Sequence, residues 1–167
     1  MDDDQHVAAA WSQLNLVLEF YSRIDTKAAV VLGLNLGMIA VLSARMERVL
    51  SDGPAWIWLL LFACLALVVV SCFHLYRCTV PDRKGGTNSL IFFGTIAQLS
   101  ESEFLNACRG RSHTELIDDL LEQTWRNSKI LQRKFDGLEQ AYKLMIAAAV
   151  PWTIALFIAM RAPAATQ

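Results

Sequence analysis

The chain contains three apolar segments without Asp, Glu, Lys or Arg, at residues 28–44, 53–76 and 144–160. The first and third have 17 residues each. A helix of that length spans about 26 Å at about 1.5 Å per residue, slightly less than the roughly 30 Å hydrocarbon core of a bilayer. A buried core helix is the alternative for these two short segments. Because so small a chain offers little to bury them, the pattern predicts three membrane helices.

Helical patterns in the polar segments continue into the apolar ones. Residues 5–46 repeat apolar positions at alternating steps of three and four, which predicts one long amphipathic helix. From Ser112 no Gly or Pro intervenes until Gly137, so we expect a second long helix that continues into the third span. The stripe of the first helix consists of Val7, Trp11, Leu14, Leu18, Tyr21 and Ala28. The stripe of the second helix consists of Ile117, Leu121, Thr124, Ser128, Leu131, Phe135, Leu138, Tyr142 and Met145. We expect these stripes to pack together as a cytoplasmic helical bundle.

Capping boxes mark two helix starts in the polar insert, residues 77–143. Ser100 and Ser112 are each followed three residues later by Glu, which predicts a short helix at 100–108 and a long one at 112–143. Pro81 and the glycines after it predict a loop over 81–99. The expected fold is therefore an all-α membrane protein with an arm (1–27), three transmembrane helices (28–44, 53–76, 144–160), the insert and a tail (161–167).

The composition supports a membrane protein, and the distribution of charge predicts its orientation in the membrane. The chain is 54% hydrophobic with a mean hydropathy of +0.35, high for a soluble globule of 167 residues. Of 15 Lys and Arg residues, all but Arg45, Arg48 and Arg161 lie on the side of the N-terminus and the insert. The positive-inside rule therefore places both in the cytoplasm. Asp2, Asp3 and Asp4 are acidic where a signal peptide needs positive charge, so we expect no signal peptide. The four cysteines lack a CxxC pattern, which favours reduced structural thiols.

No residue pattern indicates catalysis, and we expect no enzyme, metal, cofactor or nucleic-acid polymer. The three histidines, His6, His74 and His113, lack metal-ligand spacing, and no nucleotide-binding glycine motif or hydrolase motif is present. Asp118, Asp119 and Glu122 are interpreted as a solvated helix face.

An apolar, aromatic segment from Asn88 to Ile96 is unusual within the polar insert. It could be a packing strand or an interfacial segment on the bilayer. Alternatively it forms the wall of a ligand pocket, in which a planar base stacks on an aromatic ring and a glycine lets backbone N–H groups approach an anion. Nearby basic residues would bind a phosphate, although they could also anchor lipid headgroups. The candidate ligand residues are Arg83, Lys84, Asn88, Ser89, Phe92, Phe93, Gly94, Thr95, Arg109 and Arg111.

The spans contain candidate helix-contact residues. Gly33 and Gly37 form a small-residue face that permits close helix approach and oligomerisation. Asn35 points away from that face, either to hydrogen-bond a neighbouring helix or to line a pore. Pro151 predicts a kink or a released carbonyl in the third span.

Taken together, these residues resemble the transmembrane effectors of the Pycsar anti-phage systems. The resemblance is carried by Asp25-x-Lys27-Ala28 before a span with Asn35, by the segment 88–96, and by Gln123, Ser128 and Lys134-Phe135 before the final span. It covers residues 20–160. Two-helix effectors of related nucleotide-signalling systems are similar in plan.

The resemblance implies a ligand and a function. In that family a partner cyclase makes cyclic UMP or cyclic CMP on infection, and the effector impairs the bacterial inner membrane and stops growth. We therefore expect a homo-oligomeric, multi-pass inner-membrane protein that binds one of these nucleotides. The alternatives are a ligand-independent oligomeric membrane scaffold and a small channel or toxin.

Overall fold

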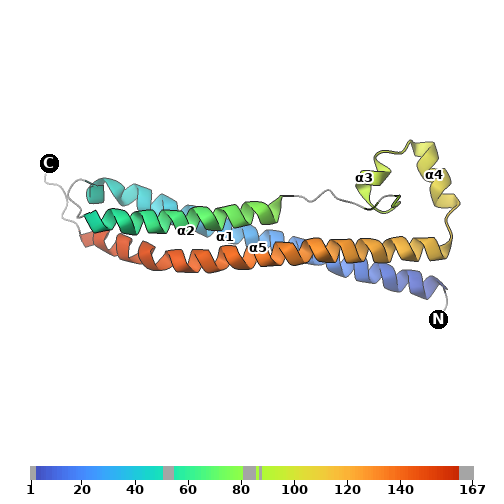
Figure 1. Cartoon of the computed structure of the whole chain (residues 1–167), viewed down its shortest axis with the longest axis horizontal. Helices are drawn as coiled ribbons and strands as arrows, with labels where there is room; N and C mark the ends of the chain where they lie inside the picture. Colours follow the sequence, from blue (N-terminus) through green and yellow to red (C-terminus); the bar gives the residue numbers. More distant parts are fainter. Residues whose placement is uncertain (1–2, 51–54, 81–85, 87, 162–167) are drawn as a thin grey trace. The chain divides into compact units, whose positions relative to one another are not determined.

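The computed structural model describes residues 3–50, 55–80, 86 and 88–161, and it describes their side chains except at residues 45–50 and 161. Its described residues form helices and turns without any strand. The helices are α1 (Asp3–Leu50), α2 (Ala55–Thr79), α3 (Phe93–Ile96), α4 (Glu101–Arg109) and α5 (His113–Arg161) (Figure 1). The all-α fold predicted from the sequence is confirmed, and so is the long helix that begins at Ser112.

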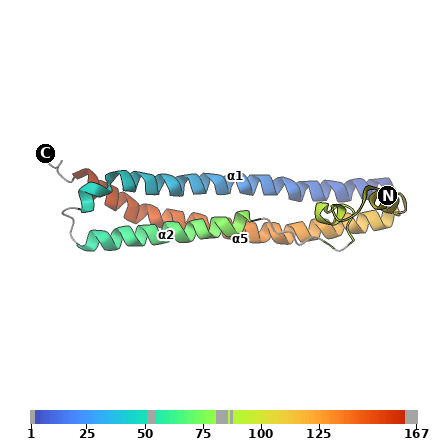
Figure 2. The same ribbon diagram turned by 90° about the horizontal axis from the view of Figure 1, so that it is seen from above.

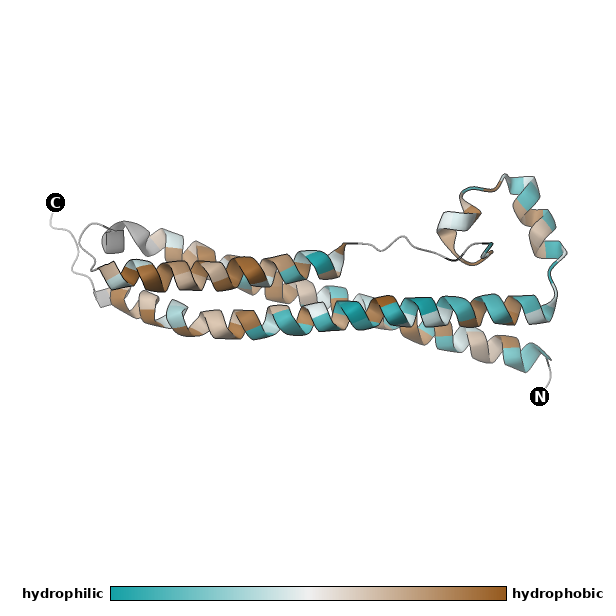
Figure 3. Cartoon of the chain, viewed as in Figure 1, coloured by the Kyte–Doolittle hydropathy of each residue, from teal (hydrophilic) through white to brown (hydrophobic). Residues whose placement is uncertain are grey.

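Within the described residues, three helical segments are long and apolar enough to cross a membrane: Asp3–Ala44, Ala55–Thr79 and His113–Met160. Hydrophobic residues cover most of α2, whereas the first half of α5 is largely hydrophilic (Figure 3). Large apolar side chains on α2 stay exposed, including Leu59 at 72% and Phe62 at 70%. Exposed apolar surface of this kind is stable in lipid, and helices satisfy their own backbone groups there. The chain is a membrane protein.

The chain divides into two compact units. Unit 1 comprises Met1–Arg23 and Pro81–Arg133, and unit 2 comprises Ile24–Val80 and Lys134–Gln167. In unit 1, Ala10 and Leu14 of α1 form a buried cluster with Leu120 of α5. In unit 2, the second part of α1, all of α2 and the second part of α5 run side by side (Figures 1 and 2).

Helices α2 and α5 are joined in unit 2 by a seam of side-chain hydrogen bonds. Cys78 Sγ donates to the carbonyl of Lys134 at 3.2 Å, Ser71 Oγ to that of Ala141 at 2.8 Å, and Cys64 Sγ to that of Ala148 at 3.8 Å. Donors and acceptors are each seven residues apart, so the bonds follow a heptad period along an antiparallel pair. A Cβ on Gly137 would lie 3.4 Å from Cys78 Cβ, which shows how closely the helices approach.

The predicted stripe on α5 is half right. The stripe consists of two heptad rows. In the first row Leu131 and Leu138 are buried as expected, but in the second row Leu121, Phe135 and Tyr142 are 44%, 38% and 50% exposed. The buried second row lies one position earlier and includes Leu120, Lys134, Ala141, Ala148 and Ala155. Steps of three and four both keep residues on one helix face. Close packing against α2 selects the alanines of unit 2 over their larger neighbours.

The predicted stripe on α1 is also shifted in part. Leu14 and Ala28 are buried, whereas Trp11 and Leu18 are 41% and 45% exposed. The buried positions Ala10, Ile24 and Val31 were not part of the predicted stripe.

Candidate functional site

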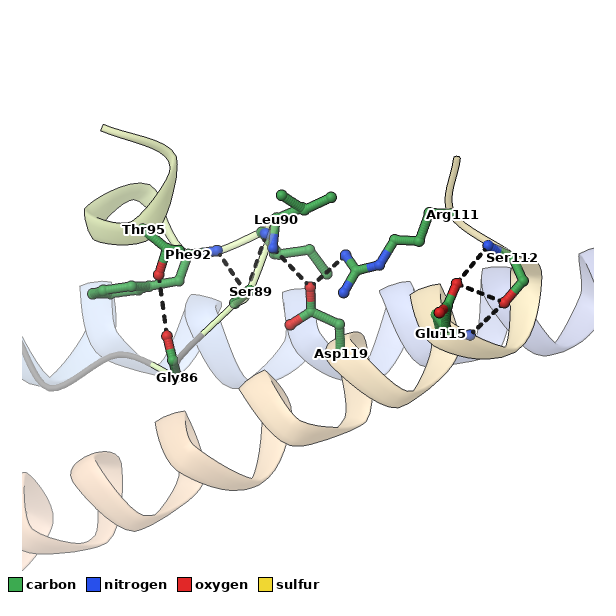
Figure 4. A network of polar contacts seen from close by, with 10 residues as sticks. Gly86, Ser89, Leu90, Phe92, Thr95, Arg111, Ser112, Glu115 and Asp119 are labelled. Atoms are coloured by element: carbon green, nitrogen blue, oxygen red, sulfur yellow. Dashed lines mark hydrogen bonds and ion pairs between the residues drawn. The ribbon is translucent and has the colours of Figure 1, made fainter. Parts of the chain in front are cut away.

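A buried carboxylate organises the polar contacts of unit 1. Asp119 Oδ2 lies 2.7 Å from Arg111 Nη1 and accepts the backbone N–H of Leu90 at 3.0 Å (Figure 4). The residue is 5% exposed. The interpretation of this part of α5 as a solvated face is therefore wrong at Asp119, although Asp118 beside it is exposed. The helix positions one carboxylate of the pair inward and the other outward.

The segment before α3 is a hydrogen-bonded turn. Ser89 is buried, and its Oγ accepts the N–H groups of Ile91 at 3.2 Å and Phe92 at 3.0 Å. Asn88 has φ of 67°, the left-handed conformation that Asn tolerates better than most residues. Thr95 Oγ1 donates to the carbonyl of Gly86 at 3.1 Å. Among the described residues of this segment the structure has turns and one helical turn, so the alternative of a packing strand is wrong.

The two phenylalanines of the segment, Phe92 and Phe93, pack against each other. Their ring centroids are 4.8 Å apart with planes tilted by 51°, and Phe93 is 69% exposed. A Cβ placed on Gly94 would lie 2.5 Å from Phe92 Cε1. Gly94 therefore leaves room for the ring of Phe92, a packing role that the sequence did not indicate.

Unit 1 has a cavity of about 430 Å³ next to the ion pair. Its volume lies within the range of about 300–1,000 Å³ found for small-molecule sites. Arg111 supplies a cation, and the half-exposed indole of Trp11 supplies an aromatic face. The lining residues are Trp11, Leu90, Ile91, Cys108, Arg111, Ser112, His113 and Leu116.

The predicted ligand residues divide into three groups. Arg111 lines the cavity, and Ser89 shapes the turn that carries Leu90 and Ile91 into its wall. Arg109 is exposed at the end of α4. Arg83 and Lys84 lie outside the described residues. The described candidates outside the cavity lining are Asn88, Ser89, Phe92, Phe93, Gly94, Thr95 and Arg109.

The sequence did not assign Trp11 to the cavity or Asp119 to the buried polar network. Trp11 was assigned to a packing stripe, and Asp119 to the solvent. Gln123, one turn beyond Asp119, is 3% exposed, and its Nε2 donates to no atom of the described chain. The signal that could have found Asp119 and Gln123 is their spacing of four, which places two polar side chains on the buried face of α5.

Both predicted capping boxes are present beside this network. Ser100 Oγ accepts the N–H of Glu103, and the Glu103 carboxylate accepts the N–H of Ser100. Ser112 and Glu115 make the same reciprocal pair at the start of α5. Hydrogen bonds from the Ser100 side chain and backbone lower the pKa of Glu103, and those from the Ser112 backbone and side chain lower that of Glu115.

In unit 2, Asn35 joins α1 to the seam between α2 and α5. Its Nδ2 donates to Ser71 Oγ at 2.8 Å, and both residues are fully buried. The predicted bond to a neighbouring helix is confirmed. Added Cβ atoms on Gly33 and Gly37 would meet no atom within 4 Å, so their face is not packed against the described chain. Pro151 lies inside α5, which continues to Arg161.

Asp25 and Lys134 form an ion pair in the same unit. Their Oδ1 and Nζ atoms are 3.1 Å apart, and the Lys134 residue is 9% exposed. The pair links α1 to α5 within unit 2.

A family model and a curated relative both match the sequence of this chain. Residues 9–161 match the Pycsar effector protein domain. The Pycsar effector protein GmPycTM of Gulbenkiania mobilis is 29% identical over 102 residues, which cover 54% of this chain and 50% of that relative. The match thus spans about half the length of the curated relative. No solved structure matches the chain significantly.

Proposed function

This chain belongs to the Pycsar effector protein family, and on that premise we propose that it is a bacterial anti-phage membrane effector that binds a cyclic pyrimidine nucleotide. Its ligand is cyclic UMP or cyclic CMP. Binding leads the protein to impair the inner membrane, and the infected cell stops growing. The N-terminus and the insert face the cytoplasm, as the distribution of Lys and Arg favours.

The main structural support for a nucleotide ligand is the cavity beside Arg111. A guanidinium binds a phosphodiester through charge-assisted hydrogen bonds and matches its planar oxygen pair better than an ammonium does. Trp11 offers an aromatic face on which a pyrimidine base stacks. The cavity also borders Ser112 and His113, where the positive end of the α5 dipole favours an anion.

Signal transmission follows from the length of α5. The helix begins at His113 beside the cavity and ends at Arg161, and it includes the third apolar segment. In the proposal, nucleotide binding at the first turns of α5 is coupled to its apolar segment, because both belong to the same helix. The nucleotide drives this change only if it binds one arrangement of the helices more tightly than the other.

The remaining aromatic and small residues have separate roles in the proposal. Exposed Phe93 extends the base-binding surface beyond the cavity. The unpacked face at Gly33 and Gly37 receives a second copy of the chain, since small residues let membrane helices approach closely.

A binding measurement with a matched variant tests the site. Isothermal titration of the detergent-purified protein with cyclic UMP and cyclic CMP is expected to give saturable binding of one of them. Arg111→Gln should weaken that binding at least about tenfold. Arg23→Gln is the control, because Arg23 pairs with Glu19 on the exposed surface of α1. Absence of binding of either nucleotide contradicts the proposed function and favours a ligand-independent scaffold.

A cellular measurement separates the effector from a channel or toxin. Expression alone should leave the membrane potential intact, and loss of potential should require the nucleotide. Leakage without any nucleotide would identify a constitutive channel or toxin instead.

A further inference from the structure

One oxygen atom ties together two walls of the cavity. Leu90 lies in the turn before α3, and Arg111 lies between α4 and α5. Both contact Asp119 Oδ2, through the Leu90 N–H at 3.0 Å and Arg111 Nη1 at 2.7 Å (Figure 4). Ile91, which also lines the cavity, is fixed one residue later by its bond to Ser89 Oγ. The carboxylate therefore determines how far apart these walls stand.

The burial of Asp119 makes this link difficult to dissociate. Its side chain is 4% exposed, whereas that of Arg111 is 18% exposed. A buried carboxylate that loses its cation is strongly destabilising, so an incoming phosphate does not remove Arg111 from Asp119. A guanidinium has five N–H donors, and the contact with Asp119 uses the Nη1 group. Arg111 can therefore hold Asp119 with one donor and an anion in the cavity with others.

We propose that Asp119 is a positioning residue of the nucleotide site, which orients the Arg111 guanidinium toward the ligand phosphate and holds the Leu90–Ile91 wall in register with it. The role rests on the proposed function, since it presupposes a phosphodiester ligand. Asp119 does not contact the nucleotide. It acts through Arg111 and through the Leu90 amide.

This role predicts opposite effects for two substitutions at one position. Asp119→Asn keeps an oxygen that accepts from Leu90 and Arg111 but removes a negative charge near the phosphate. Binding of the anionic nucleotide should therefore become tighter. Asp119→Ala removes the acceptor, leaves the Leu90 N–H without its partner and lets the guanidinium move. Binding should become weaker.

The charge effect can be separated from the structural effect by comparing ligands. Uridine and cytidine present the same bases without a phosphate. Asp119→Asn should therefore leave nucleoside binding unchanged while it tightens binding of the cyclic nucleotide. A residue with only a structural role would alter both classes of ligand together.

The experiment measures Kd values of the full chain in detergent for cyclic UMP, cyclic CMP, uridine and cytidine. We expect about 3- to 10-fold tighter nucleotide binding for Asp119→Asn and at least about tenfold weaker binding for Asp119→Ala. Asp118→Asn is the matched control, because it removes the same charge from the exposed neighbouring position and should change binding less than about twofold.

Three outcomes overturn the proposal in distinguishable ways. Unchanged or weaker nucleotide binding in Asp119→Asn, with the wild type binding normally, excludes the positioning role and leaves the proposed function intact. Equal tightening in Asp118→Asn reduces the effect to general surface charge. A wild-type protein that binds neither nucleotide overturns the proposed function and the positioning role together. Helicity by circular dichroism verifies that each variant folds, and Asp119→Asn decides the case if Asp119→Ala does not.

Discussion

Ser71 Oγ donates a hydrogen bond of 2.8 Å to the carbonyl oxygen of Ala141, and both residues are fully buried. The same hydroxyl oxygen accepts Asn35 Nδ2, so one serine connects α1, α2 and α5. Cys78 and Cys64 repeat the bond to α5 one heptad to either side. This arrangement fixes the register of the membrane helices by polar contacts as well as by packing.

Replacement of Ser71 should therefore weaken unit 2. Ser71→Ala removes the bond to Ala141 and leaves Asn35 Nδ2 without its oxygen acceptor. We expect a loss of about 0.6 to 1.7 kcal/mol in the free energy of unfolding, between the average and the maximum measured for hydrogen bonds between membrane helices by double-mutant cycles. Reversible unfolding in mixed detergent measures it. Thr153→Val is the control, since Thr153 Oγ1 bonds only within its own helix to Ala149. Equal losses in both variants would argue against an interhelical role.

Larger side chains at the buried alanines of the seam should destabilise the protein. Ala141 and Ala148 are fully buried on the face of α5 that follows the heptad row. Ala141→Leu should destabilise the protein by about 1–3 kcal/mol, because extra methylenes in a close-packed interface force helices or rotamers to shift. Ala147→Leu provides the comparison at an exposed position of the same helix. Similar stability of the two variants in detergent unfolding would show that α2 and α5 are not closely packed.

Gly94 and Phe92 should be energetically coupled. A methyl group at Gly94 would lie 2.5 Å from Phe92 Cε1, so Gly94→Ala must displace the ring, at a cost of about 1–2 kcal/mol. In a Phe92→Leu background the ring is gone, and the same substitution should be neutral or slightly stabilising because Ala restricts the unfolded chain. A double-mutant cycle by thermal unfolding measures the coupling. Gly110→Ala serves as the control, since its nearest contact is an ordinary 3.4 Å.

Acid should loosen the starts of α4 and α5. The pKa of Glu103 and that of Glu115 are lowered in the folded protein by their serine partners. A depressed folded pKa means that each carboxylate stabilises its helix above the unfolded pKa, about 4.3, and that this contribution is lost as pH falls through the lower folded value. The protection of the Ser100 and Ser112 amides against hydrogen exchange, relative to the intrinsic rate at each pH, should therefore fall in that acid range.

Glu103→Gln tests the assignment for α4. Glutamine still accepts the Ser100 N–H in a capping box but does not titrate. The acid-dependent loss of protection at Ser100 should therefore disappear in this variant and persist in Glu101→Gln, whose carboxylate is outside the box. If Ser100 retains its acid dependence in Glu103→Gln, another group is responsible.

The sequence determined the features that depend on local chemistry or on the bilayer. A transmembrane helix must satisfy its backbone hydrogen bonds internally and present apolar side chains to lipid. Hydropathy alone therefore identified the three apolar helical segments of the described chain. The capping boxes were predictable because Ser100 and Glu103, like Ser112 and Glu115, interact within one turn. Arg111 was identifiable as a site candidate because it is one of the basic residues that flank the aromatic segment 88–96 along the chain.

Tertiary contacts select which of two neighbouring helical residues faces inward. Helical periodicity permits both Leu120 and Leu121, or both Ala141 and Tyr142, on the packed face, and the partner helix selects one of each pair. The burial of Asp119 rather than Asp118 is the same choice, and it produces the contact with Arg111 and Leu90. Such choices depend on atoms distant in sequence, where hydropathy and periodicity carry no information.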